Sequence, residues 1–442
     1  MLGEYRIEGR GAAEIAASVE RAVGAGELEP GQLLPPMREL AGRLGVNPNT
    51  VAAAYRTLRE RGVIETAGRR GSRVRPKPAT TGRDQLPDVP AGVRDLSSGN
   101  PDPALLPALA PVLAAVAAEC DRAPVLYGAD PVEPELERMA RAELAADGVP
   151  DAPLTVTSGS LDAAERVLLA HLKPGDAVAV EDPGWSRTLD LIPALGLRTV
   201  PVAVDDEGPH ADAVRRALES GARALIVTAR AHNPTGAAVS AVRARALRAV
   251  LRAHPHTLLI EDDHGHGIVD LPLHPLAGVT HHWAFIRSVA KAYGPDLRLA
   301  TLTGDEVTVD RVRGRQRLGP GWVSRLLQRT VVRMWADGVV DGRAVAAAYR
   351  ARRDLLVDAL ADHGIEAHGR SGMNVWVPVP DETGAVSLLL LEGWAVAPGA
   401  RYRLATRPGI RVTVSTLTPE EAGPLAAAVA RAVTPARGRV QA

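Results

Sequence analysis

Lys291 is one of only three lysines in this chain of 442 residues, which carries 49 arginines. A lysine kept against that bias suggests a role that arginine cannot fill. A desolvated lysine can lose its proton and attack a carbonyl to form a Schiff base, whereas arginine stays protonated. Ser288 and Arg298, three residues before and seven after it, are donors that suit a phosphate group. Together these residues indicate pyridoxal 5′-phosphate (PLP) held covalently on Lys291.

Four short motifs precede Lys291 in the chain. They are TSGS at 157–160, EDPGW at 181–185, HNPTG at 232–236 and EDDH at 261–264. The HNPTG turn alone is weak evidence, because Asn-Pro and Thr-Gly are ordinary in turns. With Asp262 29 residues after Asn233, and Lys291 58 residues after it, the ordered set resembles the aspartate-aminotransferase superfamily, which is fold type I of the PLP-dependent transferases.

The resemblance implies that four residues hold the phosphate of the cofactor. Gly159 and Ser160 would lie at the start of a helix, where backbone N–H groups and the helix dipole favour an anion. Ser288 and Arg298 would add a hydroxyl and a guanidinium to the same phosphate. These four residues form the predicted phosphate site.

The resemblance also implies three contacts to the pyridine ring. Trp185 is similar to the aromatic residue that stacks on the ring, and Asn233 to the asparagine that hydrogen-bonds its phenolic oxygen. Asp262, rather than Asp263, matches the carboxylate that pairs with the ring nitrogen. A protonated nitrogen lets the ring act as an electron sink.

His264 departs from the family's pattern. Members usually carry a tyrosine two positions after the aspartate, and its hydroxyl bonds the phenolic oxygen. An imidazole can donate the same hydrogen bond, but it titrates near neutrality, with a reference pKa of about 6.5. We therefore expect PLP binding, with His264 in contact, to survive the change, while the proton balance and turnover are left open.

Two residues outside the motifs complete the set. Tyr127 resembles the tyrosine that reaches the phosphate of a neighbouring subunit. Arg411, in the segment PGIRV, is similar to the arginine that grips a substrate carboxylate with two hydrogen bonds.

The first 76 residues have a different pattern. Apolar helical stripes at 12–23, at 36–44 and from 48 onward, followed by a hairpin at 63–75, predict a winged helix-turn-helix. Residues 41–77 contain eight Arg, one Lys and two Glu, a net charge of +7, which suits DNA. This block resembles the DNA-binding domain of the GntR family, although Pro48 stands where relatives often carry Arg. The resemblance implies that DNA is contacted by Arg38, Asn47, Asn49, Thr50, Arg69 and Arg70.

The rest of the chain predicts an α/β domain and a smaller α+β domain. From about residue 94, short apolar runs such as 222–227 and 257–260 alternate with helical patterns, which favours a parallel, doubly wound sheet. In such sheets ligands bind at the carboxyl ends of the strands. The predicted boundaries are 1–76 for the winged helix, 77–93 for a Pro- and Gly-rich linker, 94–335 for the PLP-binding large domain and 336–442 for the small C-terminal domain.

Composition sets broad limits. The net charge is zero and the single cysteine, Cys120, excludes an intramolecular disulfide, which fits a reducing compartment. The sequence shows no signal peptide pattern and no run of about 18 apolar residues. We expect a cytoplasmic protein without a membrane partner and without a bound metal.

A GntR-like winged helix joined to an aminotransferase-like domain is the layout of the MocR subfamily of bacterial regulators, which this chain resembles over roughly residues 10–435. The resemblance implies a homodimer that binds operator DNA and controls transcription in response to PLP or to an amine or amino-acid ligand. Two alternatives are an active class I/II aminotransferase that carries a DNA-binding domain, and a repressor whose PLP fold has lost its cofactor. Retention of Lys291, Asp262, Asn233 and Arg298 disfavours the second.

Overall fold

The computed structural model describes residues 7–24, 27–29, 31–60, 63–66, 71–74 and 89–433. Arg69, Arg70 and most of the linker predicted at 77–93 lie outside these ranges. The chain divides into two compact units. Within the described residues, no helix is both long and apolar enough to cross a lipid bilayer.

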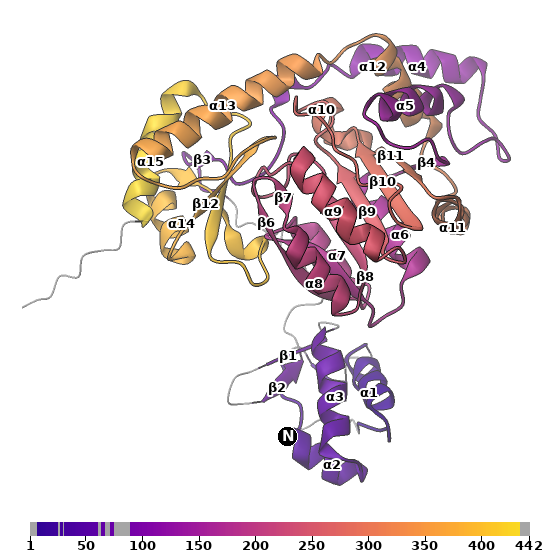
Figure 1. The fold of residues 1–442 in the computed structure, drawn as a ribbon, viewed down its shortest axis with the longest axis vertical. Coiled ribbons are helices and arrows are strands. Elements are labelled where there is room, and N and C mark those ends of the chain that lie inside the picture. Colours follow the sequence, from indigo (N-terminus) through magenta and orange to yellow (C-terminus); the bar gives the residue numbers. More distant parts are fainter. Residues whose placement is uncertain are drawn as a thin grey trace, which may run out of the picture. The chain divides into compact units, whose positions relative to one another are not determined.

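Three helices and a two-stranded antiparallel hairpin form the N-terminal domain (Figure 1). Gly45 ends the second helix in the left-handed region with φ 65°, and the Asn47 side chain accepts from Asn49 N at 2.9 Å at the start of the third. The domain has its own core, whose fully buried members include Ile15, Val19, Leu40, Val51 and Leu58. These features confirm the predicted winged helix-turn-helix. The elements are α1 (Ala12–Gly24), α2 (Met37–Leu44), α3 (Pro48–Glu60), β1 (Ile64–Thr66) and β2 (Ser72–Val74).

An eight-stranded sheet forms the centre of the large domain, in the order β4-β11-β10-β9-β8-β5-β6-β7. Strands β8, β9 and β10 run parallel to one another. Most of their residues are buried, as expected for strands covered on both faces. The strands are β4 (Leu154–Thr157), β5 (Ala177–Asp182), β6 (Arg198–Asp205), β7 (Gly208–Pro209), β8 (Ala222–Thr228), β9 (Leu258–Asp263), β10 (His282–Ser288) and β11 (Ala300–Gly304).

The sheet is mixed, which corrects the prediction of a parallel sheet. Strand β11 is antiparallel to both of its neighbours, β10 and β4. A parallel neighbour needs a crossover of about a dozen residues or more, whereas β10 and β11 are joined by residues 289–299 alone. The connection contains the short helices α10 (Ala290–Tyr293) and η3 (Pro295–Leu297). Arg298 follows η3, and its left-handed φ of 43° helps to turn the chain back.

Helices surround this sheet. Helices α8 and α9 lie against one face (Figure 1), α6 contacts β9, β10 and α11, and α12 packs on α4 and α5. The helices are α4 (Ala110–Arg122), α5 (Pro134–Ala146), α6 (Ser160–His171), α7 (Ser186–Ala194), α8 (Ala211–Glu219), α9 (Ala241–Ala253), α11 (Glu306–Arg317) and α12 (Arg325–Ala336), with the single turn η2 (Pro103–Leu105).

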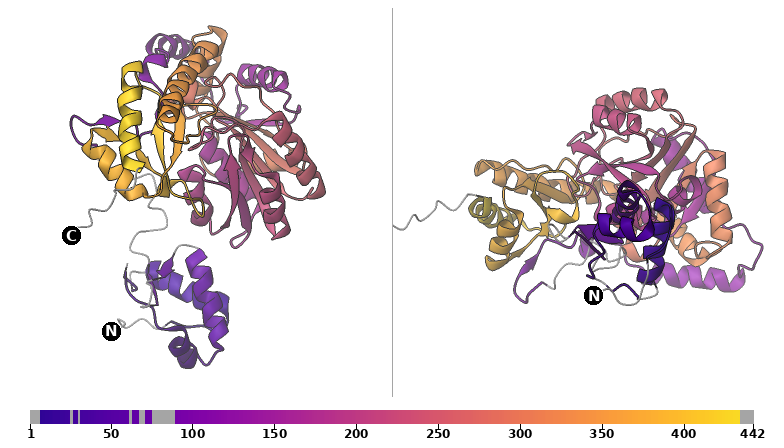
Figure 2. Two further views of the ribbon diagram at one scale, coloured as in Figure 1. Left: turned by 60° about the vertical axis from the view of Figure 1, so that its left-hand side comes forward. Right: turned by 90° about the horizontal axis from the view of Figure 1, so that it is seen from below.

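The C-terminal part is a smaller α+β layer, as predicted. A three-stranded antiparallel sheet, in the order β12-β15-β14, packs with the side-by-side helices α13 and α15 (Figures 1 and 2). A separate parallel pair joins β13 to β3, the strand that begins at Arg94. The elements are β3 (Arg94–Asp95), α13 (Gly342–Asp362), β12 (Asn374–Pro378), α14 (Glu382–Leu391), β13 (Trp394–Ala395), β14 (Ala397–Pro398), η4 (Gly399–Arg401), β15 (Gly409–Thr413) and α15 (Pro419–Val433).

Candidate functional site

The carboxyl ends of neighbouring strands bring the predicted cofactor residues to one edge of the large sheet. Asn233 follows β8, His264 follows β9, and Lys291 lies on α10 directly after β10. Strand β4 runs in the same direction as β10, because both are antiparallel to β11 between them. Ser160, which starts α6 after β4, therefore reaches the same edge.

Asp262 is the centre of a small hydrogen-bonded group. Its Oδ1 accepts from Ser160 Oγ at 2.9 Å, and its Oδ2 lies 3.2 Å from His264 Nδ1. The other ring nitrogen, His264 Nε2, lies 2.9 Å from the carbonyl oxygen of Ala231. The side chains of Asp262 and His264 are largely buried. The Ser160 hydroxyl thus donates to the carboxylate of Asp262, and its contact with a phosphate stays a prediction.

His264 has opposing influences on its charge. Burial lowers the pKa of His264, but the hydrogen bond to Asp262 and the negative charge of that carboxylate outweigh burial and raise it above its usual value. Lys291 is close enough to repel a charged imidazole. The sequence anticipated neither the contact between His264 and Asp262 nor the one between His264 and Ala231.

Gly159 and Arg298 meet at the predicted phosphate site. Arg298 Nη2 donates to the carbonyl oxygen of Ser158 at 2.7 Å. Gly159 has φ +103°, a backbone conformation that favours glycine, and a Cβ on it would lie 2.8 Å from the same Nη2, so a side chain there would push the guanidinium aside. Asp162 is turned to Ser158 N and Arg166. A backbone turn at a helix start beside an arginine is a suitable anion site.

Lys291 contacts the segment at the start of the large domain. Its Nζ donates to the carbonyl oxygen of Gly99 at 2.9 Å. Ser288 is buried, and its hydroxyl accepts from Ala290 N at 3.2 Å, which fixes the entry into α10. The contact with Gly99 could not be read from the sequence, because it joins residues 192 positions apart.

Arg411 lies in the middle of β15 and is buried. Its Nη1 donates to Asn233 Oδ1 at 3.1 Å and its Nη2 to the carbonyl oxygen of Ser97. The guanidinium also stacks on the ring of Tyr402, 4.9 Å from the ring centre, a favourable cation–π geometry. The small domain thereby supplies a charged group that contacts Asn233. Sequence reasoning missed Tyr402, since an isolated tyrosine carries no pattern.

Trp185 is half-buried at the end of the EDPGW motif. The motif is anchored to the small domain, since Gly184 N donates to the carbonyl oxygen of Tyr402 at 2.7 Å and Asp182 accepts from the backbone of residues 404–406. The loop that carries Trp185 is therefore held firmly, as a stacking residue requires.

Tyr127 is 94% exposed and its ring packs edge-on against Trp322 at 5.7 Å. Beside it lies a cavity of about 470 Å³. Leu126 and Leu318 are also strongly exposed. The cavity is lined by Cys120, Val125, Pro320, Trp322, Ser324, Arg325 and Leu326. This surface does not take part in the contacts around Asp262.

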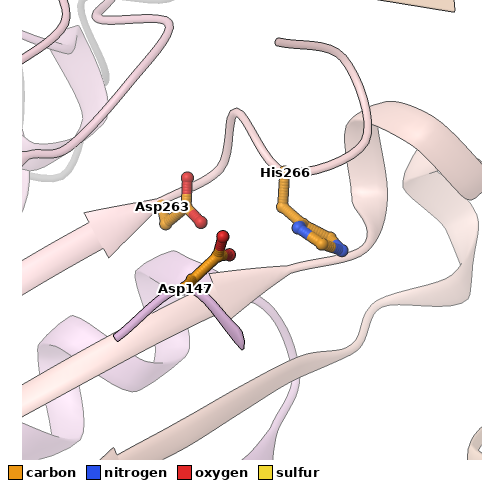
Figure 3. A group of neighbouring side chains, drawn as sticks. All are labelled: Asp147, Asp263 and His266. Carbon is orange, nitrogen blue, oxygen red and sulfur yellow. The ribbon is translucent and has the colours of Figure 1, made fainter. Parts of the chain in front are cut away.

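Asp263, next to Asp262, belongs to a different cluster, drawn in Figure 3 with Asp147 and His266. The ligand atoms of the three residues lie within 4.8 Å of one another. Arg230 Nη2 lies 2.7 Å from Asp263 and Arg287 Nη2 lies 2.5 Å from Asp147. Although burial alone would raise it, these two cations lower the pKa of Asp263 to about 2. The cluster is a buried ion-pair network, and its arginines disfavour a metal ion.

The site residues fit PLP. Lys291 would offer the amine for the aldehyde, Asp262 a carboxylate for the ring nitrogen, and Arg298 with the Gly159 turn an anion site for the phosphate. The close approach of the Arg298 guanidinium to Gly159, which a Cβ at 159 would disturb, is the structural observation that favours a phosphate there.

The predicted DNA-contacting residues in the described part of the N-terminal domain lie on α2 and at the start of α3. Arg38, Asn47 and Asn49 are exposed, and Thr50 is half-buried. The Asn47 side chain caps α3, which leaves Asn49 as the freer amide for base edges. Arg69 and Arg70 lie outside the described residues.

Two family models match this chain. The model for aminotransferase class I and II matches residues 93–429, and the model for bacterial regulatory proteins of the gntR family matches residues 12–74. Among solved structures, the α-aminoadipate aminotransferase LysN of Thermus thermophilus has a TM-score of 0.68 at 21% identity, over 79% of this chain and 95% of that one. The kynurenine aminotransferase of Pyrococcus horikoshii also has a TM-score of 0.68, at 18% identity, over 78% and 91%. At these identities the likeness concerns the fold alone.

Two curated relatives match most of this chain. The vitamin B6 salvage pathway transcriptional repressor PtsJ of Salmonella typhimurium is 42% identical over 436 residues, 97% of this chain and 99% of that protein. The pyridoxine biosynthesis transcriptional regulator PdxR of Corynebacterium glutamicum is 28% identical over 381 residues, 79% and 78%. With a GntR domain followed by an aminotransferase class I and II domain, this chain belongs to the MocR subfamily of bacterial transcriptional regulators.

Proposed function

We propose that this chain is a homodimeric transcriptional regulator of the cytoplasm, which binds operator DNA through its winged helix and senses PLP through its aminotransferase-like domain. One observation carries the proposal: a DNA-binding fold and a site that suits PLP, centred on Lys291 and Asp262, occur in a single chain. The repressor of vitamin B6 salvage that matches 97% of this chain supports PLP as the ligand.

Three groups would hold the ligand. Lys291 supplies the amine, Arg298 and the turn at Gly159 bind the phosphate, and Asp262 accepts from the ring nitrogen. Bound PLP supplies an aldehyde to the amine and an electron-withdrawing ring. The chain's own contribution is to orient these groups on the ends of adjacent strands, where the sheet keeps them rigid.

The segment that follows the linker offers a route from the site to the DNA-binding domain. Lys291 Nζ donates to the carbonyl of Gly99, and Arg411 Nη2 to that of Ser97. If the amine of Lys291 is bound to PLP, it has fewer protons to donate to the carbonyl of Gly99. A ligand carboxylate that binds Arg411 competes with the carbonyl of Ser97 for the protons of the guanidinium. Ligands therefore act on residues 97–99, which follow the predicted linker at 77–93. A ligand shifts a conformational equilibrium only by such differences in contact.

The exposed surface around Tyr127 suits a second copy of the chain. Leu126, next to Tyr127 in the chain, is 71% exposed, and exposed apolar side chains that gather in one patch are typical of a protein–protein interface. In the homodimer that we propose, Tyr127 contacts the phosphate held by the other subunit.

An aminotransferase that carries a DNA-binding domain is the second candidate. The contact of Arg411 with Asn233 favours it, since a buried arginine beside the cofactor site is able to bind the carboxylate of an amino acid. The same contact would let an amino acid act as a second effector of a regulator.

The first prediction concerns the attachment point. Borohydride reduction of the PLP-loaded protein, followed by peptide mapping, should place the pyridoxyl group on Lys291. Lys291→Ala should remain folded, because alanine is favourable in a helix, and it should lose the visible absorbance of the bound cofactor, because no amine is left at this position for the aldehyde. Labelling of Lys173 in place of Lys291 would contradict the assignment.

The second prediction concerns the phosphate site. Gly159→Ala should weaken PLP binding by roughly 10- to 100-fold, since its Cβ meets Arg298 and its φ of +103° is strained for alanine, at a cost of about 1–3 kcal/mol. Fluorescence titration with PLP measures the change. Gly148→Ala is the matched control, with φ +75° and no atom within 4 Å of its Cβ; equal losses in both variants would rule out the Arg298 contact as the cause.

The third prediction concerns the DNA-binding face. Arg38→Ala should weaken specific binding by about 1–3 kcal/mol, as expected for one good contact, and affinity should fall steeply with salt. A duplex selected from random DNA with the purified protein serves as the operator. Arg21→Ala, exposed on α1, should bind as tightly as the wild-type chain. If the two variants bind alike, the assignment of α2 and α3 to DNA is wrong.

The fourth prediction tests the proposed function directly. Addition of PLP to the cofactor-depleted protein should change its affinity for the selected duplex, and Lys291→Ala should bind the duplex without responding to PLP. Fluorescence anisotropy measures both. The alternative, an active aminotransferase, would be favoured by two results together: an operator affinity that PLP does not change, and steady transamination at roughly 1–10³ per second.

A further inference from the structure

We propose that His264 is a positioning residue that draws the charge of Asp262 away from a bound cofactor ring, and that it thereby suits the site to ligand sensing rather than to fast transamination. The inference deepens the proposed function and rests on it. It starts from the two contacts of the imidazole ring.

Both nitrogens of His264 face groups that only accept hydrogen bonds. Nδ1 lies 3.2 Å from Asp262 Oδ2, and Nε2 lies 2.9 Å from the carbonyl oxygen of Ala231. An ionised carboxylate and a backbone carbonyl cannot donate, so each contact is a hydrogen bond only when that ring nitrogen carries a proton. The arrangement therefore favours the cationic imidazolium, in which both nitrogens are protonated. The direction of the pKa of His264, which is upward despite burial, agrees with this geometry.

The cation changes what Asp262 can offer. Ser160 Oγ already donates to Oδ1, and His264 donates to Oδ2. A carboxylate has about four lone-pair sites, so it still accepts from a ring nitrogen. Its charge is nevertheless shared with an imidazolium in direct contact. A proton on the ring nitrogen is then held less firmly than it would be by Asp262 alone, and the ring is a weaker electron sink.

The imidazole also has no proton left for the phenolic oxygen. Its two N–H groups are directed to Asp262 and Ala231, whereas a tyrosine hydroxyl at this position would be neutral and would leave the charge of Asp262 intact. Binding of the cofactor does not depend on this residue, because Lys291 and the Gly159–Arg298 turn hold its other ends. Histidine in place of tyrosine at position 264 therefore weakens proton transfer more than it weakens the affinity for the cofactor.

A spectroscopic titration tests the inference. His264→Gln replaces the cation with a neutral amide, so less charge opposes a proton near Lys291. The pH midpoint at which the visible absorbance of bound PLP changes should rise by on the order of one unit. The matched control is His266→Gln, whose imidazole faces Glu143 at 3.2 Å and whose midpoint should match that of the wild-type protein. An unchanged or lowered midpoint in His264→Gln overturns the proposal.

A single-turnover experiment provides a second readout. With L-glutamate, the amino group passes to the bound cofactor, the oxygen of a water molecule takes its place on the α-carbon, and 2-oxoglutarate is released, so L-glutamate and water are the only reactants added. Both His264→Gln and His264→Tyr should release 2-oxoglutarate at least about tenfold faster than the wild-type protein, because neither side chain places a positive charge against Asp262. Equal rates in all three proteins overturn the proposal.

A measurement on the unmodified protein covers the case in which a variant fails to fold or to bind PLP. Nitrogen-15 NMR of the labelled wild-type chain, with the ring signals of His264 assigned through bonds from its own backbone amide, reports the protonation of each ring nitrogen. At pH 6.5, the ordinary pKa of histidine, both nitrogens of His264 should be mostly protonated, and a mostly neutral ring at this pH overturns the proposal. None of these readouts involves DNA, so their failure is distinct from an operator affinity that ignores PLP.

Discussion

The register of three parallel strands is the constraint on which the site depends. Asp262 on β9 lies opposite Thr228 on β8 and Ile286 on β10. Because side chains alternate between the two faces of a strand, a slip of one residue would exchange the places of Asp262 and Asp263. The carboxylate beside Ser160 and the carboxylate paired with Arg230 would then both be misplaced.

Three consecutive acids on β9 fix this register by having different partners. Glu261 is fully buried, and burial raises its pKa to about 8 even though Leu276 N and Ala277 N donate to it. At pH 7 it is therefore mostly neutral, which lowers the cost of burying it. Asp263, on the same face of the strand, is ionised between two arginines. Asp262 faces the other way, toward the candidate site, so the pleat sorts three similar side chains into three environments.

The sequence predicts the elements well because their signals are local. The helical stripe that ends at Gly45, the buried runs that became β8 and β9, and the long helix α13 can all be read within a short window. The prediction of a parallel sheet was wrong for β11. The direction of this strand depends on the short connection from β10 through Arg298, and not on the composition of the strand.

For the candidate site, the ordered motifs indicated which residues converge, and the structure brings Asp262, His264 and Ser160 together, and Asn233 with Arg411. What the motifs could not supply is the choice of hydrogen-bond partner. The contacts of His264 with Ala231, of Lys291 with Gly99 and of Arg411 with Tyr402 depend on groups that carry no sequence pattern, two of them backbone carbonyls. Their assigned roles toward a cofactor stay predictions.

The use of main-chain carbonyls has a consequence for mutational tolerance. A carbonyl is present in every amino acid, so exchange of Ser97 for another small residue leaves the acceptor of Arg411 in place. Position 99 behaves in the opposite way. Gly99 has φ +68°, and a Cβ there would lie 3.0 Å from Arg411 Nη1, so a side chain would displace the guanidinium while the carbonyl for Lys291 remained. Substitutions at position 97 are therefore tolerated as long as the residue is small, whereas a substitution at position 99, two residues away, is not.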